Sequence, residues 1–219
     1  MTSKVKAYKG IGMEGSLARW YDRTTRKDMP AIRTLATRIA EVVPTGAAVL
    51  EVAPGPGFLS IELVKRGLHV RAVDISRTFV DIAQRNASAE GVEARFEMGN
   101  AAALPVEDAS MDFVVCRAAF KNFAEPVKAL KEMRRVLRPG GTALLIDMRR
   151  DVPVAELQRH VDGLGVSRLN RWFMMCVFRR MLIKRAYRLE DIRHMAAEAG
   201  WIESRIETSP LGFEAWTTK

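Results

Sequence analysis

A glycine- and proline-rich turn that follows a short apolar run constrains this chain most strongly. The apolar run is Val49–Val52, and the turn Ala53–Gly57 follows it directly, before a second apolar segment that begins at Phe58. An apolar run of strand length, a Gly/Pro turn and then helical apolar spacing predict a buried strand connected to a helix. In an α/β sheet this connection lies at the carboxyl end of a strand, where ligands bind. We therefore expect a ligand site at this turn.

The residues of the turn have distinct physical roles. Gly55 and Gly57 lack a Cβ, so they adopt positive φ easily and let a ligand lie against the main chain. Pro54 and Pro56 restrict the flexibility of the same loop. A helix expected over Phe58–Arg66 would direct its free N–H groups toward the turn, which favours an anionic ligand group.

Two acidic residues flank the predicted site. Glu51 lies inside the first strand and is an acceptor for a cationic or N–H-bearing ligand group, directly or through water. His69–Asp74 has the alternating, β-branched character of a second strand. Its terminal Asp74 follows the turn by about 20 residues, the distance at which such folds bind a ribose diol. Asp74 is therefore the predicted ribose ligand.

Residues 49–57 resemble the first motif of class I S-adenosylmethionine-dependent methyltransferases. That motif has an acidic residue and an apolar residue before three alternating glycines, and Ala53 stands here in place of the first glycine. Gly99–Ala101, with Leu104–Pro105, resembles the segment of the family that contacts the adenine edge, which usually reads Gly-Asp-Ala and then Leu-Pro. Asn100 replaces the usual acid, and its side-chain oxygen still accepts a hydrogen bond from the adenine amine.

Two later segments extend the resemblance. Met111–Cys116 resembles the fourth strand of the family, and Leu137–Thr142 resembles the turn before the fifth. The four motifs occur in the family's order and cover Thr45–Asp147. The resemblance, closest to the methyltransferase type 11 and ubiquinone/menaquinone methyltransferase-like group, implies S-adenosyl-L-methionine as cofactor and S-adenosyl-L-homocysteine as product. It implies cofactor contacts from Tyr21, Glu51, Ala53, Pro54, Gly55, Gly57, Asp74, Ile75, Asn100, Ala101 and Arg117.

The whole chain predicts one α/β domain with a Rossmann-like, doubly wound sheet. Its four parts are an N-terminal helical cap (1–44), a cofactor-binding core (45–148), a helical lid inserted after the fifth strand (149–187), and a C-terminal helix and antiparallel hairpin (188–219). The βα alternation predicts parallel strands with right-handed crossovers. The expected strands are Ala48–Val52, Val70–Ile75, Ala94–Glu97, Phe113–Cys116, Thr142–Asp147, Ile202–Glu207 and Phe213–Thr217.

Composition limits the class of protein. A chain of 219 residues, 48% of them hydrophobic, forms a sizeable core without disulfides. We find no apolar run of transmembrane length and no signal-peptide core, so we expect a cytoplasmic protein. Cys116 and Cys176 are expected to be buried free thiols, and the three histidines are scattered, so no metal site is expected.

The N-terminal aromatic residues are candidates for the site. Methyltransferases of this class commonly carry N-terminal helices as a cap over the cofactor, so Tyr8, Trp20 and Tyr21 are candidates to face the sulfonium or the substrate. For Trp20, packing of its helix onto the sheet is an equally good interpretation. Tyr21 is the residue for which we favour a functional role.

The loop after the fourth strand supplies further candidates. Arg117 is suited to bind a carboxylate, and Lys121 or Asn122 to orient the acceptor; a solvated loop charge is the alternative for Lys121. Asp147 is the best-placed acid, although capping or pairing with Arg149 is the simpler role. The catalytic base therefore stays open among Tyr21, Lys121 and Asp147. The candidate substrate contacts are Phe120, Asn122, Trp172 and Phe173.

The segment Arg171–Arg185 is apolar nearly all round and rich in arginine. A lid that packs on the sheet is the simplest interpretation, and it indicates an apolar or aromatic small-molecule acceptor that carries negative charge. A basic amphipathic surface on an anionic membrane, with a quinone or lipid substrate, is the second interpretation. A nucleic-acid face is the third, which a net charge of +9 permits, but we do not expect RNA because no RNA-binding motif is appended.

Two other functions fit the turn and Asp74 alone. One is an NAD-dependent oxidoreductase, and the other is a nucleotide-binding partner or regulator without activity. The expected antiparallel hairpin favours the methyltransferase sheet over a six-stranded parallel dehydrogenase sheet. The acceptor atom and the oligomeric state stay open, because motifs that bind the donor do not encode them.

Overall fold

A single mixed β-sheet organises the chain. The computed structural model describes residues 8–9, 12–163, 175, 183–201 and 204–219. The strands of the sheet are β1 (Ala48–Val52), β2 (His69–Asp74), β3 (Arg95–Met98), β4 (Met111–Arg117), β5 (Leu137–Met148), β6 (Ser204–Thr208) and β7 (Gly212–Thr218).

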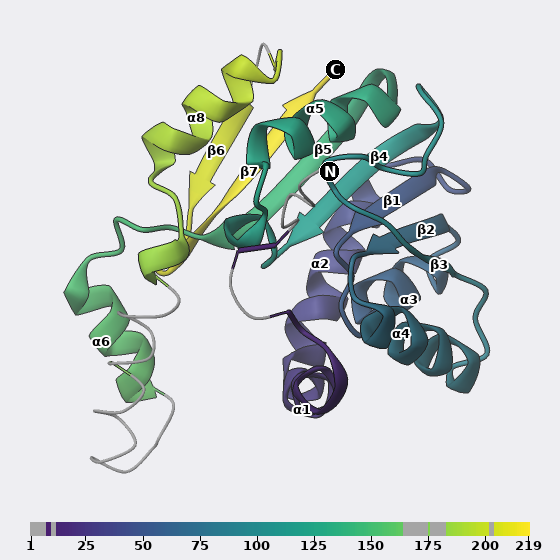
Figure 1. The fold of residues 1–219 in the computed structure, drawn as a ribbon, viewed down its shortest axis with the longest axis horizontal. Helices are drawn as coiled ribbons and strands as arrows, with labels where there is room; N and C mark the ends of the chain where they lie inside the picture. The colour runs from purple at the N-terminus through teal and green to yellow at the C-terminus, as the bar shows by residue number, and fades with distance from the viewer. Residues whose placement is uncertain (1–7, 10–11, 164–174, 176–182, 202–203) are drawn as a thin grey trace, which may run out of the picture.

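The strand order is β3-β2-β1-β4-β5-β7-β6 (Figure 1). The strands from β3 to β5 are parallel to their neighbours, whereas β7 runs antiparallel to both β5 and β6. The predicted fold class is therefore confirmed, including seven strands and the antiparallel hairpin at the end. The order reverses between β1 and β4, which is the switch point where open α/β sheets bind ligands.

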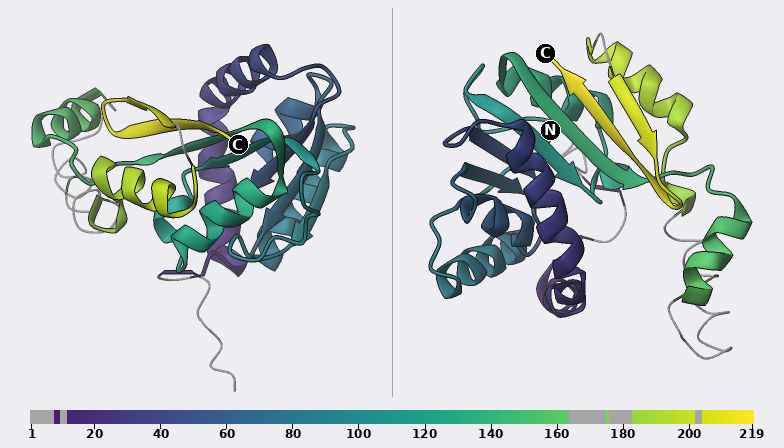
Figure 2. Two further views of the ribbon diagram at one scale, coloured as in Figure 1. Left: turned by 90° about the horizontal axis from the view of Figure 1, so that it is seen from above. Right: turned by 180° about the vertical axis from the view of Figure 1, so that it is seen from behind.

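Helices cover both faces of the sheet. Figure 2, right, shows α2 running across one face, while α5 and α8 lie on the other (Figure 1). The helices are α1 (Gly15–Thr25), α2 (Met29–Val42), α3 (Phe58–Val64), α4 (Arg77–Ala89), α5 (Pro126–Val136), α6 (Val154–Gly163) and α8 (Leu189–Glu198), with 3-10 turns at Arg26–Asp28, Phe120–Asn122 and Ile183–Arg185.

Alternate residues of the strands divide the core between the two faces. Val49 and Val115 pack with α2 and α3, whereas their chain neighbours Leu50 and Val114 pack with α5 and α8. This alternation follows from the two-residue period of a strand. All four side chains are fully buried, as expected for the centre of a doubly covered parallel sheet.

The ends of the sheet differ in detail from the prediction. β5 begins at Leu137, where we expected a turn, because Leu137 is fully buried and pairs with Met111 before the register shifts. In β7, Glu214 accepts hydrogen bonds of 3.0 and 2.7 Å from the Arg38 guanidinium, and the Trp216 ring contacts Phe113. The last strand is thereby bound to α2 and to the core.

Only part of the expected lid is described. α6 and the 3-10 turn Ile183–Arg185 belong to it, whereas the candidates Trp172, Phe173 and Cys176 lie outside the described residues. The lid at 149–187 therefore stays a prediction. No helix in the described ranges is both long enough and apolar enough to cross a membrane.

Candidate active site

The predicted site residues come from adjacent strand ends. β1 and β4 pair at Glu51 and Val115, and β2 pairs with β3 at Asp74 and Met98. Because the strands are parallel, their carboxyl ends share one edge of the sheet. The turn after β1, the acid that ends β2 and the loops after β3, β4 and β5 are therefore neighbours.

The turn after β1 has the backbone shape of a glycine-rich loop. Gly55 and Gly57 have φ of 55° and 81°, and Ala53 also has positive φ, at 59°. The N–H of Ala53 donates to the Val73 carbonyl at 2.8 Å, which holds the alanine in this conformation. Ala53 therefore adopts a left-handed backbone at the position where the methyltransferase motif that it resembles has glycine, at a cost of about 1–2 kcal/mol.

The two glycines of the turn serve different needs. A Cβ on Gly57 would lie 2.8 Å from the Ala83 Cβ, so packing of the turn against α4 excludes any side chain. A Cβ on Gly55 would meet nothing closer than the Tyr21 ring, at 3.9 Å. Gly55 is buried, but a Cβ there would make only an ordinary contact, so its main chain is not closely packed by other side chains and is suited to contact a ligand.

Asp74 connects the second strand to the turn. Its carboxylate accepts a hydrogen bond of 3.1 Å from the Gly55 N–H and one of 2.8 Å from the Ser76 N–H. Burial raises the pKa of Asp74 to about 6, although these N–H donors favour the ionised form. An ionised carboxylate has about four acceptor positions, so it retains capacity for ligand hydroxyls. This geometry fits the predicted ribose role.

Glu51 is a buried acid behind the turn. Its side chain is 3% exposed, and it accepts a short hydrogen bond from the Ser60 hydroxyl on α3. Burial raises the pKa of Glu51 to about 7, while the Ser60 hydrogen bond and the positive charge of Arg117 oppose the shift. A ligand cation near this carboxylate would stabilise its ionised form.

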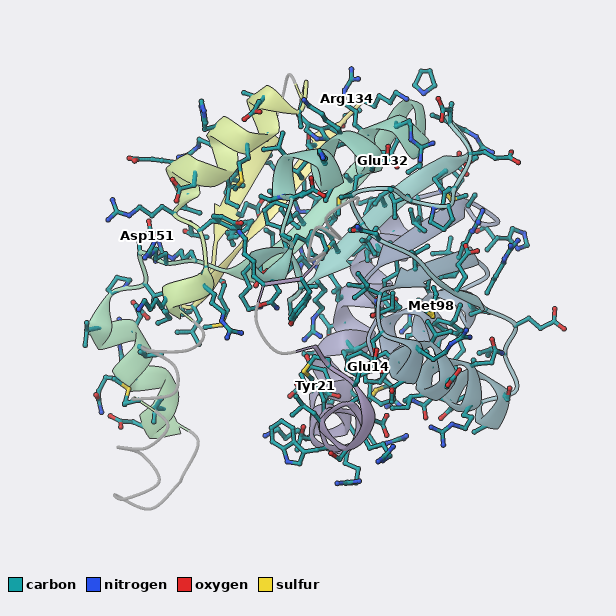
Figure 3. All side chains as sticks on the ribbon, in the orientation of Figure 1. Glu14, Tyr21, Met98, Glu132, Arg134 and Asp151 are labelled. Atoms are coloured by element: carbon teal, nitrogen blue, oxygen red, sulfur yellow. The ribbon has the colours of Figure 1, made fainter. Side chains whose placement is uncertain are left out.

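Tyr21, on α1, lies against the turn Ala53–Gly57 at Gly55. Its ring makes an edge contact with Phe79 at 5.8 Å between centroids, and its Cε1 would lie 3.9 Å from a Cβ on Gly55. Burial raises the pKa of Tyr21, partly offset by Arg117. Figure 3 places Tyr21 at α1, far from the labelled α5 residues Glu132 and Arg134. The functional role predicted for Tyr21 is compatible with this position.

Trp20 does not follow the packing interpretation that we considered for it. It is 53% exposed, so it does not pack α1 onto the sheet, and a role toward the substrate stays a prediction. It lies next to Tyr21 in the helix, about 100° further around the helix axis. The inner face of α1 is instead formed by Ala18 and Tyr21, which pack against Phe79 and Ile82.

An N-terminal segment beside the site was missed by the sequence interpretation. The Glu14 carboxylate accepts hydrogen bonds of 3.1 Å from the N–H groups of both Arg77 and Thr78, at the start of α4. The Ser76 hydroxyl, next to Asp74 in this loop, donates to the Met13 carbonyl at 2.7 Å. The Ser76 side chain is a recognisable helix cap, but nothing in the sequence indicates that Glu14 completes it from more than sixty residues away.

The two polar candidates near β4 and β5 bind each other. Lys121 Nζ lies 2.8 Å from Asp147 Oδ1, and the Lys121 N–H donates to Asp147 Oδ2 at 2.8 Å. Both side chains are buried. Lys121 is therefore not a solvated loop charge, and Asp147 pairs with Lys121 rather than with Arg149. Lys121 Nζ also donates to the carbonyl of Ala118, whose φ is 59°, so the pair fixes the loop after β4.

The other candidates in the loop after β4 differ in how deeply they are buried. Phe120, predicted to contact the substrate, is fully buried against Phe123 and Tyr187. This is the position of a core residue, and the hydrophobic effect explains why the ring turns inward. Arg117 is half-buried and acts electrostatically on Glu51 and Tyr21. The Asn122 carbonyl accepts a hydrogen bond from the Lys9 N–H at 2.7 Å.

The predicted adenine region lies after β2 and β3. Ile75 is 40% exposed, as an apolar contact for a ligand ring would be. The Asn100 side-chain oxygen accepts a hydrogen bond of 2.9 Å from the Ala102 N–H, and Ala101 is half-buried. An amide oxygen has a second lone pair, so the predicted bond from an adenine amine stays compatible with this turn. Tyr8 is half-exposed at the same edge, and burial raises its pKa.

Comparisons with known proteins find similar sequences and a similar fold. Residues 50–145 match the family described as "Methyltransferase domain". Demethylmenaquinone methyltransferase from Deinococcus radiodurans is 44% identical over 101 residues, which are 45% of this chain and 42% of that protein. Ubiquinone biosynthesis O-methyltransferase from Xanthomonas axonopodis pv. citri is 25% identical over 209 residues, or 92% of this chain and 82% of that protein. The chain spans about half the length of several curated relatives.

A solved structure extends the likeness to the whole fold. A protein from Methanococcus maripaludis, provisionally named an S-adenosyl-L-methionine-dependent methyltransferase, aligns with a TM-score of 0.75 and 21% identity. The alignment covers 96% of this chain and 95% of that chain. At this identity the likeness shows a shared fold.

Proposed function

The chain is a member of the class I S-adenosylmethionine-dependent methyltransferases, and we propose that it methylates an apolar, quinone-type small molecule. The observation that carries the proposal is the turn Ala53–Gly57, which has left-handed backbone at three positions and room for a contact beside Gly55 under the Tyr21 ring. Asp74 binds the same turn through Gly55. These two features support a ribose-binding edge at the turn.

The acceptor class rests on the site and on the names of the relatives. The relatives compared above are named for demethylmenaquinone and for ubiquinone biosynthesis, and both names refer to aromatic quinone compounds. The partly buried aromatic residues Tyr8 and Tyr21 and the exposed Ile75 belong to the segments around the carboxyl edge of the sheet. Arg117 and Arg185 act electrostatically on these tyrosines, so an acceptor with negative charge also fits.

Positioning and electrostatics are the main contributions that we assign to the protein. Bound S-adenosylmethionine supplies a methyl group on a sulfonium, which an acceptor displaces in line. Glu51 and Asp74 provide buried acceptors for the cofactor's polar groups, and Tyr21 covers the turn. Aligning the two reactants in a site that excludes water accounts for a large part of the acceleration of such a reaction.

No residue is assigned as general base. Burial raises the pKa of both Tyr8 and Tyr21, so these phenols are neutral near pH 7 and act as hydrogen-bond donors. Lys121 and Asp147 are bound to each other. The proposed reaction therefore uses an acceptor that is already deprotonated or that gives its proton to solvent.

The competing oxidoreductase hypothesis has less support. It predicted a sixth parallel strand, whereas β7 lies antiparallel beside β5. A non-enzymatic role for the fold predicts cofactor binding without turnover. These alternatives are separated by the transfer experiment below.

Methyl transfer tests the proposal directly. The chain is incubated with methyl-labelled donor and with short-chain forms of a reduced naphthoquinone and of a polyprenylated catechol. We expect label in the organic extract, and loss of that label in the Asp74→Ala variant. Label in an RNA fraction, or donor binding without transfer to either class of acceptor, would contradict the proposed substrate class.

A further inference from the structure

The outer face of α1 exposes two large apolar side chains. Trp20 is 53% exposed and Leu17 is 37% exposed. They are three residues apart, so they lie on the same face of the helix. Ala18 and Tyr21 lie about 100° further around the helix axis and pack against Phe79 and Ile82, so the orientation of α1 is set by the core. The packing of α1 therefore fixes the exposed position of Trp20.

Arginine residues surround this apolar face. A hollow between α1 and α4 is lined by Arg19, Arg23, Arg26 and Arg85, together with Asp22 and Asn86. Arg26 is fixed in the hollow by a hydrogen bond of 2.9 Å to Asn86 and lies 5.1 Å above the Phe58 ring. Arg26 also forms an ion pair of 3.4 Å with Asp22, which is the one acidic residue among those that line the hollow.

Two of these arginines are not neutralised. In the part of the chain that the structure describes, neither Arg19 nor Arg23 forms an ion pair, and both are exposed. Arg85 is also exposed and donates to the carbonyl of Asp81 in its own helix. The hollow therefore combines several positive charges with one partly neutralised carboxylate, and it attracts phosphate groups.

We propose that the outer face of α1, with the arginine-lined hollow beside it, docks onto the surface of an anionic phospholipid bilayer. Trp and Leu insert at the level of the headgroups, and arginine binds the lipid phosphates around them. A bilayer suits this face better than RNA does. The aliphatic side chain of Leu17 cannot stack on a nucleobase, whereas a lipid interface accommodates it. Docking is independent of the proposed methyl transfer, which needs neither Leu17 nor Trp20.

The position of α1 gives this surface a consequence for the site. The helix bears Tyr21 over the turn Ala53–Gly57 and the exposed Trp20 about 100° further around its axis. A bilayer bound to the Trp20 face would lie within one helix diameter, about 10–12 Å, of Tyr21. Acceptors dissolved in the bilayer would then be close to the proposed site.

Vesicle flotation tests the docking surface without donor or acceptor. The chain is mixed with vesicles of phosphatidylcholine or of phosphatidylcholine with phosphatidylglycerol, at low and at high salt. We expect binding to the anionic vesicles at low salt and its loss at high salt, because salt screens exposed charges. Equal binding to both compositions, or binding to added RNA and to neither vesicle, would overturn the proposal.

Charge reversal locates the surface. Each basic residue near an anionic bilayer contributes about five-fold in binding, so the Arg23→Glu variant should bind roughly twenty-five-fold more weakly. The matched control is Arg193→Glu, an exposed arginine on α8, which should leave binding nearly unchanged apart from a small effect of net charge. Equal losses in the two variants would show that only net charge matters and would overturn the proposal.

Trp20 provides an independent optical readout. In the intact chain, anionic vesicles should shift tryptophan emission to shorter wavelength, and the Trp20→Phe variant should bind vesicles without that shift. Trp20→Ala should bind roughly ten-fold more weakly if about half of the exposed indole enters the interface. Retained S-adenosylhomocysteine binding shows that each variant is folded. An emission shift of unchanged size in Trp20→Phe would show that Trp20 does not enter the bilayer and would overturn the proposed contact.

Discussion

The ammonium group of Lys121 lies 2.8 Å from Oδ1 of Asp147, and the two side chains are only 8% and 1% exposed. The same carboxylate accepts hydrogen bonds from the main-chain N–H groups of Lys121 and Met148. This pair joins the loop after β4 to the end of β5, at the edge where the predicted site lies. A pair of this kind orders the loop even though it does not act on the substrate.

Removing one partner of the pair should destabilise the fold unequally. Asp147→Leu leaves the buried ammonium and two N–H groups without their carboxylate, and it should cost about 3–5 kcal/mol. Lys121→Met should cost less, because Asp147 keeps its two main-chain donors. Urea unfolding measures both free energies, and a larger loss for Lys121→Met would contradict this description of the pair.

The turn should respond in opposite ways to two substitutions. Ala53→Gly relieves a left-handed alanine, worth about 1–2 kcal/mol, and adds about 0.5–1 kcal/mol of unfolded-state entropy. The free energy of unfolding should therefore stay level or rise by about 1 kcal/mol. Gly57→Ala should lower it, because the new Cβ would lie 2.8 Å from Ala83 and the residue has φ of 81°. A stabilising Gly57→Ala, measured by urea unfolding, would show that the turn has another conformation.

Asp74 should contribute to cofactor affinity. Asp74→Ala removes the acceptor for Gly55 N–H and for ligand hydroxyls, so S-adenosylhomocysteine should bind about 1–3 kcal/mol more weakly. Asp112→Ala is the control, because Asp112 accepts from the Ala48 N–H at the opposite end of β1. Calorimetric titration compares them. An equal loss of affinity in both variants would indicate a general effect on the fold.

The pKa of Glu51 should make stability depend on pH. Burial raises this pKa from an ordinary 4.5 to about 7, so the folded chain holds the proton more tightly than the unfolded chain. The stabilisation is fully present below pH 4.5 and is lost as pH rises through about 7. Its size is of the order of 3 kcal/mol.

Glu51→Gln isolates this contribution. The variant cannot titrate at position 51, so the fall in unfolding free energy between about pH 5 and pH 8 should become smaller. Asp74, whose pKa is raised to about 6, supplies the part that persists. Urea unfolding at the two pH values measures the change in unfolding free energy. An unchanged pH dependence in Glu51→Gln would show that the pKa of Glu51 is not raised by burial.

The sheet was predictable from the sequence because its signals are local. Period-two apolar runs, the Gly/Pro turn after Val52 and the acid at Asp74 each specify a short segment, and parallel connections restrict how the segments assemble. The positive φ of Ala53 did not follow from the residue type, because alanine rarely adopts this backbone. Strand boundaries were less certain, as the early start of β5 at Leu137 shows.

The long-range contacts of the site were not predictable in the same way. Lys121 and Asp147 lie 26 residues apart, and Glu14 reaches α4 across 64 residues. Such pairs depend on the exact placement of two loops, which periodicity does not encode. The sequence also did not determine which face of α1 packs on the protein. The apolar spacing was compatible with either Trp20 or Tyr21 facing the sheet.

In the proposed site, the turn Ala53–Gly57 and Asp74 bind S-adenosylmethionine rather than a dinucleotide. Parallel calorimetric titrations of the purified chain with S-adenosylhomocysteine and with NAD separate these two ligands. We expect saturable binding of S-adenosylhomocysteine, weakened by Asp74→Ala, and no binding of NAD. Saturable binding of NAD with no response to S-adenosylhomocysteine would contradict this expectation.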